Sequence, residues 1–302
     1  MRPPIDIERI SKSYEDIEAL KDISFQVNQA EIFGLIGPDG AGKTSLFRIL
    51  TTLLLPDTGD AYVQGYHIVK EYKKIRNIIG YMPGRFSLYQ DLSVEENLSL
   101  FASIFGTTIE ENYELVKEIY SQIEPFKDRR AGQLSGGMKQ KLALSCALIH
   151  KPEVLFLDEP TTGVDPVSRK EFWGMLKNLK THGITILVST PYMDEANMCD
   201  KIGLIQNGEI LSIDTPEKMT QDFDRDIYAI KTAKKHEFLQ SLKSYKNTHS
   251  VFSFGDSIHY IDKRYEITES EILSSFGKME LPEFKIEKIK PTVEDCFMEL
   301  MK

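Results

Sequence analysis

The residues best suited to chemistry lie in one short glycine-rich stretch. It consists of Gly37, Pro38, Asp39, Gly40, Ala41, Gly42, Lys43 and Thr44, with Ser45 directly after. The order matches G-x-x-x-x-G-K-[ST], a pattern whose backbone N–H groups surround a phosphate at the start of a helix. In such a loop Lys43 reaches the outer phosphates, and the hydroxyl of Thr44 is a ligand for Mg²⁺. We therefore expect residues 37–45 to bind a nucleotide.

The segments on either side support this interpretation. Residues 32–36 form an apolar run of the kind found in buried strands, and residues 45–50 have the apolar spacing of a helix. The alternative, a glycine-rich turn that carries a lysine by chance, explains neither neighbour. Tyr14 stands in an earlier loop. It is either an aromatic ring that stacks on an adenine base or an ordinary solvent-facing tyrosine.

An acidic pair follows another buried strand. Residues 154–157 read Val-Leu-Phe-Leu, and Asp158 and Glu159 come directly after them. A carboxylate at the end of a parallel strand can hold Mg²⁺ beside the phosphate loop, and its neighbour can orient or deprotonate a water. An acidic strand end without chemistry is the alternative, but the apolar run directs the pair toward the nucleotide. The predicted reaction is phosphoryl transfer to water, with Thr44 and Asp158 on the metal and Glu159 as the catalytic residue.

A second candidate anion site precedes a helical segment. Ser135, Gly136 and Gly137 stand before residues 138–150, which have a continuous small and apolar face. A hydroxyl and two glycines at a helix N-terminus allow a phosphate to approach closely. Taken alone, Ser-Gly-Gly is only a helix cap. Its position shortly before Asp158 favours the functional interpretation.

Composition is that of an ordinary soluble protein. The chain has 302 residues, of which 41% are hydrophobic and 27% charged, enough for about two domains. The net charge of −9 provides no basic field, so no nucleic-acid partner is expected. Three scattered cysteines fit a reducing cytoplasm, and neither a signal peptide nor a run long enough to cross a membrane is visible. Any membrane association is therefore expected to come through a partner.

The order of elements predicts an α/β fold with a parallel sheet. Apolar strands alternate with helical segments, the strands lying at residues 32–36, 78–82, 154–157 and 184–188. Residues 5–30 have the alternation of short antiparallel strands, and a helical block spans about residues 85–150. Asn207-Gly208 predicts a hairpin turn.

A polar stretch near residues 216–226 separates two expected domains, residues 1–225 and residues 226–302. The second has the pattern strand, helix, strand, strand, helix, strand, helix, a small α+β unit of ferredoxin-like order. It carries no chemical motif. We interpret it as an accessory domain.

These motifs together resemble the ATP-binding subunit of an ABC transporter. The resemblance is carried by residues 37–44, 134–140, 154–160 and 163–166, and it covers about residues 5–215. It implies a P-loop core with a parallel sheet, an antiparallel β subdomain and a helical subdomain. The tail, which closes with Pro291-Thr-Val-Glu-Asp-Cys-Phe, more loosely resembles the C-terminal extension of bacterial multidrug and antibiotic exporter ATPases.

The resemblance implies a dimer of nucleotide-binding domains that holds ATP and Mg²⁺ and drives a separate membrane permease. Tyr14 would stack on adenine, and Ser135 and Gly137 would reach the γ-phosphate of the partner's ATP. Asp165 would belong to the loop that communicates across the dimer. Beyond the phosphate loop, the residues implied to contact nucleotide are Tyr14, Ser135, Gly136, Gly137 and Asp165.

Two positions depart from the family pattern. Gly84 stands where the family has a glutamine that touches Mg²⁺ and the attacking water, and Pro191 stands where it has a histidine on the γ-phosphate. Neither residue has a polar side chain. We therefore expect a degenerate site that binds ATP but hydrolyses it slowly, unless Arg85 or Thr190 compensates. Asp39, where asparagine is frequent, marks a subgroup similar to the first half of tandem-ATPase exporter subunits.

The leading interpretation is the ATPase of a bacterial-type exporter, located in the cytoplasm on the inner face of the membrane. Because the Ser135 motif is intact, a heterodimer with a second, fully equipped ATPase domain is favoured over a homodimer. The alternatives are a regulatory ATP-binding subunit that does not hydrolyse ATP, and a non-transport ABC protein that acts on ribosomes or DNA. The substrate cannot be derived from this chain, because selectivity belongs to the permease.

Overall fold

The computed structural model describes residues 2–277, 279 and 281–301. Two compact units divide the chain between Pro216 and Glu217. The boundary expected after residue 225 lies later, directly before strand β11 (Ile227–Thr232). The difference arises because the polar stretch contains helix α7 (Pro216–Gln221), which the sequence pattern did not show.

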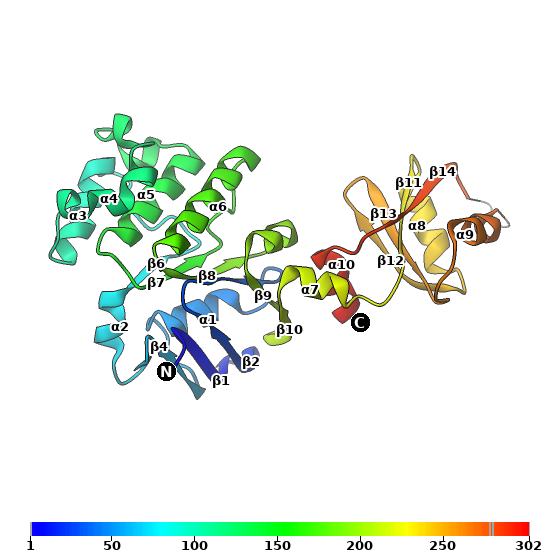
Figure 1. Ribbon diagram of the computed structural model, residues 1–302, viewed down its shortest axis with the longest axis horizontal. Coiled ribbons are helices and arrows are strands. Elements are labelled where there is room, and N and C mark those ends of the chain that lie inside the picture. The colour runs from blue at the N-terminus through cyan, green and yellow to red at the C-terminus, as the bar shows by residue number, and fades with distance from the viewer. Residues whose placement is uncertain (1, 278, 280, 302) are drawn as a thin grey trace. The chain divides into compact units, whose positions relative to one another are not determined.

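The first unit is built on a six-stranded central sheet (Figure 1). Its strands, in spatial order, are β10 (Glu209–Asp214), β9 (Lys201–Gln206), β3 (Ile32–Ile36), β8 (Thr185–Thr190), β7 (Val154–Asp158) and β6 (Ile79–Met82). All neighbouring strands are parallel except β9 and β10. The predicted parallel sheet is confirmed. Every residue of β3, β7 and β8 is buried, as expected of strands covered on both faces.

The antiparallel edge forms at the predicted hairpin. Asn207 and Gly208 have φ values of 49° and 78°, so both occupy the left-handed region that a two-residue type I′ turn requires. Glu209 then pairs with Gln206.

A second sheet of four antiparallel strands carries the N-terminus. Its order is β2 (Ile17–Val27), β1 (Ile5–Tyr14), β4 (Thr58–Val63) and β5 (Tyr66–His67). The expected short strands are in fact 10 and 11 residues long, because register shifts let β1 and β2 stay paired through irregular stretches. One hydrophobic core joins this sheet, helix α1 (Lys43–Leu50) and the central sheet. The phosphate loop is thus anchored from both sides.

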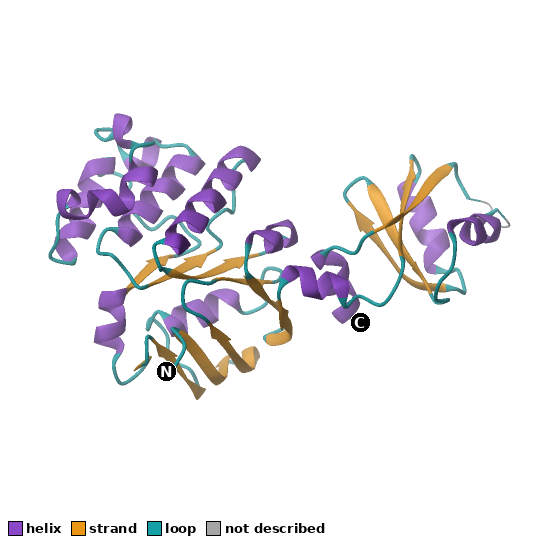
Figure 2. Ribbon diagram, in the orientation of Figure 1, coloured by secondary structure: helices purple, strands orange, loops and turns teal. Residues whose placement is uncertain are grey.

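Helices cover the other face of the central sheet (Figure 2). They include α5 (Gly136–Leu148), α6 (Pro166–Thr181) and the 3₁₀ segment Met193–Met198, and α5 in turn packs against α3 (Val94–Ile104) and α4 (Ile109–Tyr120). The 3₁₀ turns Glu124–Phe126 and Ala131–Gln133 lie between α4 and α5 in the chain. Helix α2 (Tyr72–Ile78) lies instead on the side of α1, where its Ile75 joins the same core. Ser93 and Glu96 form a capping box at the start of α3. The helical segment expected at residues 138–150 begins two residues earlier, at Gly136, because Ser135 caps α5.

The second unit has the expected ferredoxin-like sheet. Its elements are β11, α8 (Lys235–Lys243), β12 (Thr248–Phe254), β13 (Ser257–Asp262), α9 (Glu269–Phe276), β14 (Phe284–Ile289) and α10 (Val293–Leu300), with strand order β12-β13-β11-β14. Helices α8 and α9 share a core with one sheet face. A buried pair of His259 and Asp295, 2.7 Å apart, attaches α10 to β13. In the described part of the chain, no helix has the length and apolarity needed to cross a membrane.

Candidate nucleotide-binding site

A pocket of about 440 Å³ lies where the parallel strands of the central sheet end. Strands β3, β6, β7 and β8 all lead into this edge, where polar loops at strand ends characteristically bind ligands. The pocket is lined by Thr44, Arg48, Tyr81, Pro83, Gly84, Arg85, Asp158 and Glu159. The structure therefore brings three of the predicted residues, Thr44, Asp158 and Glu159, into one cavity.

Glycine is required at two positions of the phosphate loop. A Cβ on Gly37 would lie 2.1 Å from the carbonyl oxygen of Ile205. Gly42 has a φ of 106°, and a Cβ there would lie 2.4 Å from the carbonyl oxygen of Ala19. The loop consequently packs its backbone directly against β9 and β2, which leaves its N–H groups at the start of α1.

Lys43 is enclosed by this loop. The residue is 3% exposed, and its Nζ donates to the carbonyl oxygens of Gly37 at 2.8 Å and Pro38 at 3.0 Å. The same Nζ lies 3.1 Å from Oε1 of Glu159. A fixed ammonium thus stands between the loop and the acidic pair, where it can meet the charge of a phosphate.

The acidic pair is held in place by Ser189. The hydroxyl of Ser189 donates to Oδ1 of Asp158 at 2.6 Å, and the backbone N–H of Glu159 donates to Oγ of Ser189 at 3.0 Å. Asp158 is 2% exposed, while Glu159 has a φ of 51°. A left-handed glutamate is uncommon, and such residues concentrate at functional sites. Ser189 was not predicted as a site residue; its position near the end of an apolar strand was the available signal.

The oxygens in this pocket fit Mg²⁺. Thr44 offers a hydroxyl and Asp158 a carboxylate, the hard ligands that this ion prefers. Among the residues that the structure describes, no three His, Cys, Asp or Glu side chains group into a complete metal site. A magnesium ion held here would need further oxygens from phosphate and water, which is its usual manner of binding beside nucleotides.

Tyr81 contributes a neutral hydroxyl to the pocket wall. Burial, together with the negative charge of Asp158, raises the pKa of Tyr81 to about 12. The tyrosine therefore stays protonated at physiological pH. Nothing in the sequence pattern had distinguished it from a structural strand residue.

The two departures lie next to this chemistry. A Cβ on Gly84 would lie 3.8 Å from Oδ2 of Asp158, so a longer polar side chain there would reach the carboxylate. Pro191 directly follows the last residue of β8. Thr190 is fully buried; its hydroxyl donates to Glu195 at 2.5 Å and accepts from the N–H of Tyr192 at 3.0 Å. Arg85, by contrast, is exposed and lines the pocket.

Tyr14 lies at the end of β1, close to the phosphate loop. Its hydroxyl is 3.2 Å from Oγ of Ser45, and the side chain is 41% exposed. The ring is thus both anchored and accessible, as stacking on a base requires. Stacking on adenine stays a prediction.

The second anion motif lies outside the pocket. Ser135 accepts a hydrogen bond from the N–H of Met138 at 3.4 Å and so caps α5. Asp165 caps α6, and the hydrogen bonds to it, first from the N–H of Ser168, hold its pKa below the usual value. A Cβ on Gly137 would lie 2.8 Å from Oγ of Ser168, which keeps the two helix starts together. Neither motif lines the cavity around Asp158.

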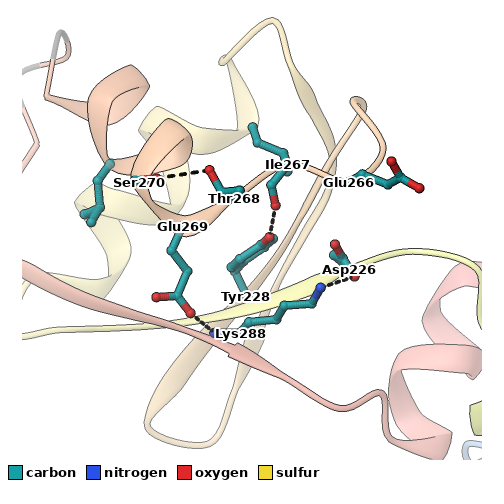
Figure 3. Close-up of a pocket in the computed structure, with 9 residues that line it drawn as sticks. Asp226, Tyr228, Glu266, Ile267, Thr268, Glu269, Ser270 and Lys288 are labelled. Atoms are coloured by element: carbon teal, nitrogen blue, oxygen red, sulfur yellow. Dashed lines mark hydrogen bonds and ion pairs between the residues drawn. The ribbon is translucent and has the colours of Figure 1, made fainter.

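A further pocket, of about 760 Å³, lies in the second unit (Figure 3). Several of its polar groups are paired with one another: Nζ of Lys288 lies 2.7 Å from Asp226, and the backbone N–H of Lys288 donates to Glu269 at 2.8 Å. The hydroxyl of Tyr228 donates to the carbonyl of Ile267. Since these groups satisfy one another, this pocket is a weaker candidate than the cavity at the strand ends.

Known proteins match the chain as follows. A profile described as ABC transporter matches residues 20–162. The probable multidrug ABC transporter ATP-binding protein YbhF of Escherichia coli is 38% identical over 290 residues, 95% of this chain and 50% of that protein. The Nod factor export ATP-binding protein I of Burkholderia thailandensis is 37% identical over 72% of this chain and 73% of its own length. The linearmycin resistance ATP-binding protein LnrL of Bacillus subtilis is 33% identical over 87% of this chain and 85% of its own length. The chain spans about half the length of YbhF.

Solved structures agree with the sequence matches. An ATP-binding subunit of an ABC transporter superposes with a TM-score of 0.66 at 27% identity, covering 72% of this chain and 92% of that one. The dimeric cassette MJ0796 superposes with a TM-score of 0.64 at 26% identity, covering 70% of this chain and 98% of that one. The predicted family and the predicted P-loop fold are both confirmed. The chain belongs to the ABC ATPases, the ATP-binding proteins of ABC transporters.

Proposed function

We propose that this chain binds ATP with Mg²⁺ and, paired with another ABC ATPase domain on a membrane permease, couples ATP binding and hydrolysis to export. The observation that carries the proposal is the cavity lined by Thr44, Asp158 and Glu159, with Nζ of Lys43 3.1 Å from the Glu159 carboxylate. The exporter role is supported by relatives named for multidrug transport, Nod factor export and linearmycin resistance. The chain would work in the cytoplasm, at the inner face of the membrane, attached through the permease.

The geometry suggests a role for each residue in and around the cavity. Lys43 would contact the outer phosphates, and Thr44 and Asp158 would hold Mg²⁺, which neutralises phosphate charge. Glu159 would orient or deprotonate the attacking water. Its carboxylate lies 3.1 Å from Nζ of Lys43, the group that would contact the phosphate. Ser189 fixes the acidic pair. Tyr14 would carry the adenine, with Ser45 anchoring its hydroxyl.

We further propose that this chain's own site is degenerate. Gly84 stands beside Asp158 but supplies no side chain, and Pro191 supplies no donor at the end of β8. Removing one positioned transition-state donor commonly costs about 10²–10³ in rate, so two such losses should leave binding with little turnover. Thr190 is a poor substitute because its hydroxyl is engaged with Glu195 and Tyr192. Arg85 remains a candidate for compensation.

A degenerate site favours a heterodimer. The motif Ser135-Gly136-Gly137 is intact and lies at the exposed N-terminus of α5. It would therefore complete the ATP site of a partner domain. A partner with its own glutamine and histidine would then provide most of the hydrolysis. In a homodimer both sites would lack these groups.

The experiment is affinity purification of the chain from native membranes, followed by identification of the co-purifying proteins and ATP titration of the complex. The proposal expects a permease, a second ABC ATPase domain and Mg²⁺-dependent ATP binding. Recovery of ribosomal or DNA-repair proteins in place of a permease would contradict the transport role.

A second candidate is a regulatory subunit that never hydrolyses ATP, and the Gly84 and Pro191 positions favour it over an ordinary ATPase. Turnover of the purified complex separates the two candidates. A complex that binds ATP but hydrolyses none would support the regulatory subunit.

A further inference from the structure

The segment after Pro191 contains a buried carboxylate that takes no part in the proposed chemistry. Glu195 is 3% exposed. One of its oxygens accepts from the hydroxyl of Thr190 at 2.5 Å, and the other accepts from the hydroxyl of Thr161 at 2.8 Å. Nε of Arg169 also donates to it at 3.1 Å. A charge this deeply buried is retained only with such partners, so the four side chains form one unit.

Arg169 makes further contacts with the segment of residues 192–195. Its guanidinium lies 4.3 Å from the ring centroid of Tyr192, and it makes a second ion pair of 3.3 Å with the exposed Asp194. Arg169 belongs to the first turns of α6, the helix that Asp165 caps. Residues 190–195 and residues 161–169 are therefore fastened together by a charged, largely desolvated contact.

This contact begins directly at the phosphate loop. The N–H of Gly37 donates to the carbonyl oxygen of Thr190 at 3.3 Å. From Gly37 the chain of contacts runs through Thr190 and Glu195 to Thr161, which is two residues beyond Glu159. With proline at position 191, no side chain at that position can report the γ-phosphate, but the backbone route from the loop is intact.

We propose that Glu195 is a positioning residue that couples nucleotide occupancy of the phosphate loop to residues 161–169, the segment that carries Asp165. This inference rests on the proposed function, since it needs ATP in the loop. It goes further because it names a contact, that of Glu195 with Thr161 and Arg169, through which ATP in a slow site could influence a partner domain. Residues 161–169 would have one arrangement with ATP bound and another without it, and the Glu195 contact would link that change to the phosphate loop.

The test is hydrogen–deuterium exchange of the purified chain with and without Mg²⁺-ATP. In the wild type, ATP is expected to slow exchange in residues 37–50 and also in residues 161–169. In Glu195→Gln, residues 37–50 keep their response, while the ATP-dependent change in residues 161–169 falls by about threefold or more. Because the readout is the change caused by ATP, a merely structural role for Glu195 would not produce this result.

Two further variants keep the test decisive. Asp194→Asn removes the exposed partner of Arg169 and should respond as the wild type does. Thr161→Val deletes one hydroxyl at nearly constant shape, so it should weaken the response even where Glu195→Gln does not fold. An undiminished response of residues 161–169 in both Glu195→Gln and Thr161→Val would overturn the coupling alone. Absence of any ATP response in residues 37–50 of the wild type would instead overturn ATP binding itself.

Discussion

The two sides of the candidate site differ in how completely they are equipped. The phosphate-loop side consists of Lys43, Thr44, Asp158 and Glu159, and its charged groups are bonded to the backbone, to Ser189 or to each other. The sensor side consists of residues 84 and 191, where glycine and proline offer no polar side chain. Under the proposed function, binding and hydrolysis depend on largely separate groups, so a chain could keep one set while losing the other.

This difference has a simple energetic basis. Contacts that form equally in the bound state and the transition state hold the nucleotide without speeding its cleavage. The phosphate-loop side supplies mainly such contacts. Glu159 would act on the attacking water, but the polar side chains that would assist it in the transition state are absent at positions 84 and 191.

Restoring the sensor side should give the largest effect. Gly84→Gln combined with Pro191→His is expected to raise hydrolysis in this chain's own site by about 10²-fold, because the added side chains would act in the transition state. A Cβ at position 84 would lie 3.1 Å from the carbonyl oxygen of Asp158, so the neighbour must move by a few tenths of an ångström. Single-turnover ATPase assays of the purified chain, without the partner domain, measure the change.

The control is Gly84→Ala with Pro191→Ala, which makes similar steric changes without the polar groups. It should give no gain. Equal rates in the restored and control variants would show that the missing donors do not limit this site.

Breaking the phosphate-loop side should weaken ATP binding. Lys43→Ala is expected to weaken ATP affinity by about tenfold to a hundredfold, the range for loss of a charge-assisted hydrogen bond. Equilibrium titration with a fluorescent ATP analogue measures this. The matched control is Lys74→Ala, which removes an exposed lysine that pairs with Glu71 on α2. If Lys43→Ala binds ATP as the wild type does, the loop does not hold the nucleotide in the assigned manner.

Tyr14 should have a smaller effect. Tyr14→Ala is expected to weaken ATP binding by about fivefold or more, since stacking on a base is worth about 1 kcal/mol or more. Tyr14→Phe keeps the ring and loses only the hydroxyl contact with Ser45, so its affinity should remain within about twofold of the wild type. The same titration measures both. An equal loss in both variants would indicate that the hydroxyl, and not the ring, matters.

Arg85 should have the smallest effect. Arg85→Ala is expected to change turnover by less than about threefold, because an exposed side chain is not a positioned transition-state donor. Lys139→Ala, a change at another cation near the same segment, is the control; its Nζ lies 5.5 Å from the ring centroid of Phe86. A loss of tenfold or more on Arg85→Ala alone would mean that this arginine replaces the missing sensors.

Local patterns predicted much of this fold. The loop at residues 37–44, the Asn207-Gly208 hairpin and the order of elements after residue 226 depend on short-range spacing and turn chemistry, which a sequence displays directly. Helix α2 was missed because only Ile75 of its seven residues is buried, which leaves no apolar periodicity. The long, irregular pairing of β1 and β2 also exceeded what alternation alone indicates.

The site was predicted less completely than the loop. Ser189 and Glu195 act on residues some thirty positions away, on other strands and loops, and only the register of β7 with β8 and the course of the following loops reveal them. Spacing along the chain cannot show such contacts. Thr190 and Arg85 differ for the same reason, because a sequence does not display burial. Thr190 is buried away from the pocket, whereas Arg85 lines it.

One measurement tests most directly whether this site binds ATP without hydrolysing it efficiently. ATP affinity and single-turnover hydrolysis of the purified chain are compared for the wild type and Glu159→Gln. We predict that both bind Mg²⁺-ATP and that their hydrolysis rates agree within about twofold, since removing the catalytic carboxylate matters little where the sensor side is empty. A wild-type rate at least about a hundredfold above that of Glu159→Gln would contradict the degenerate site.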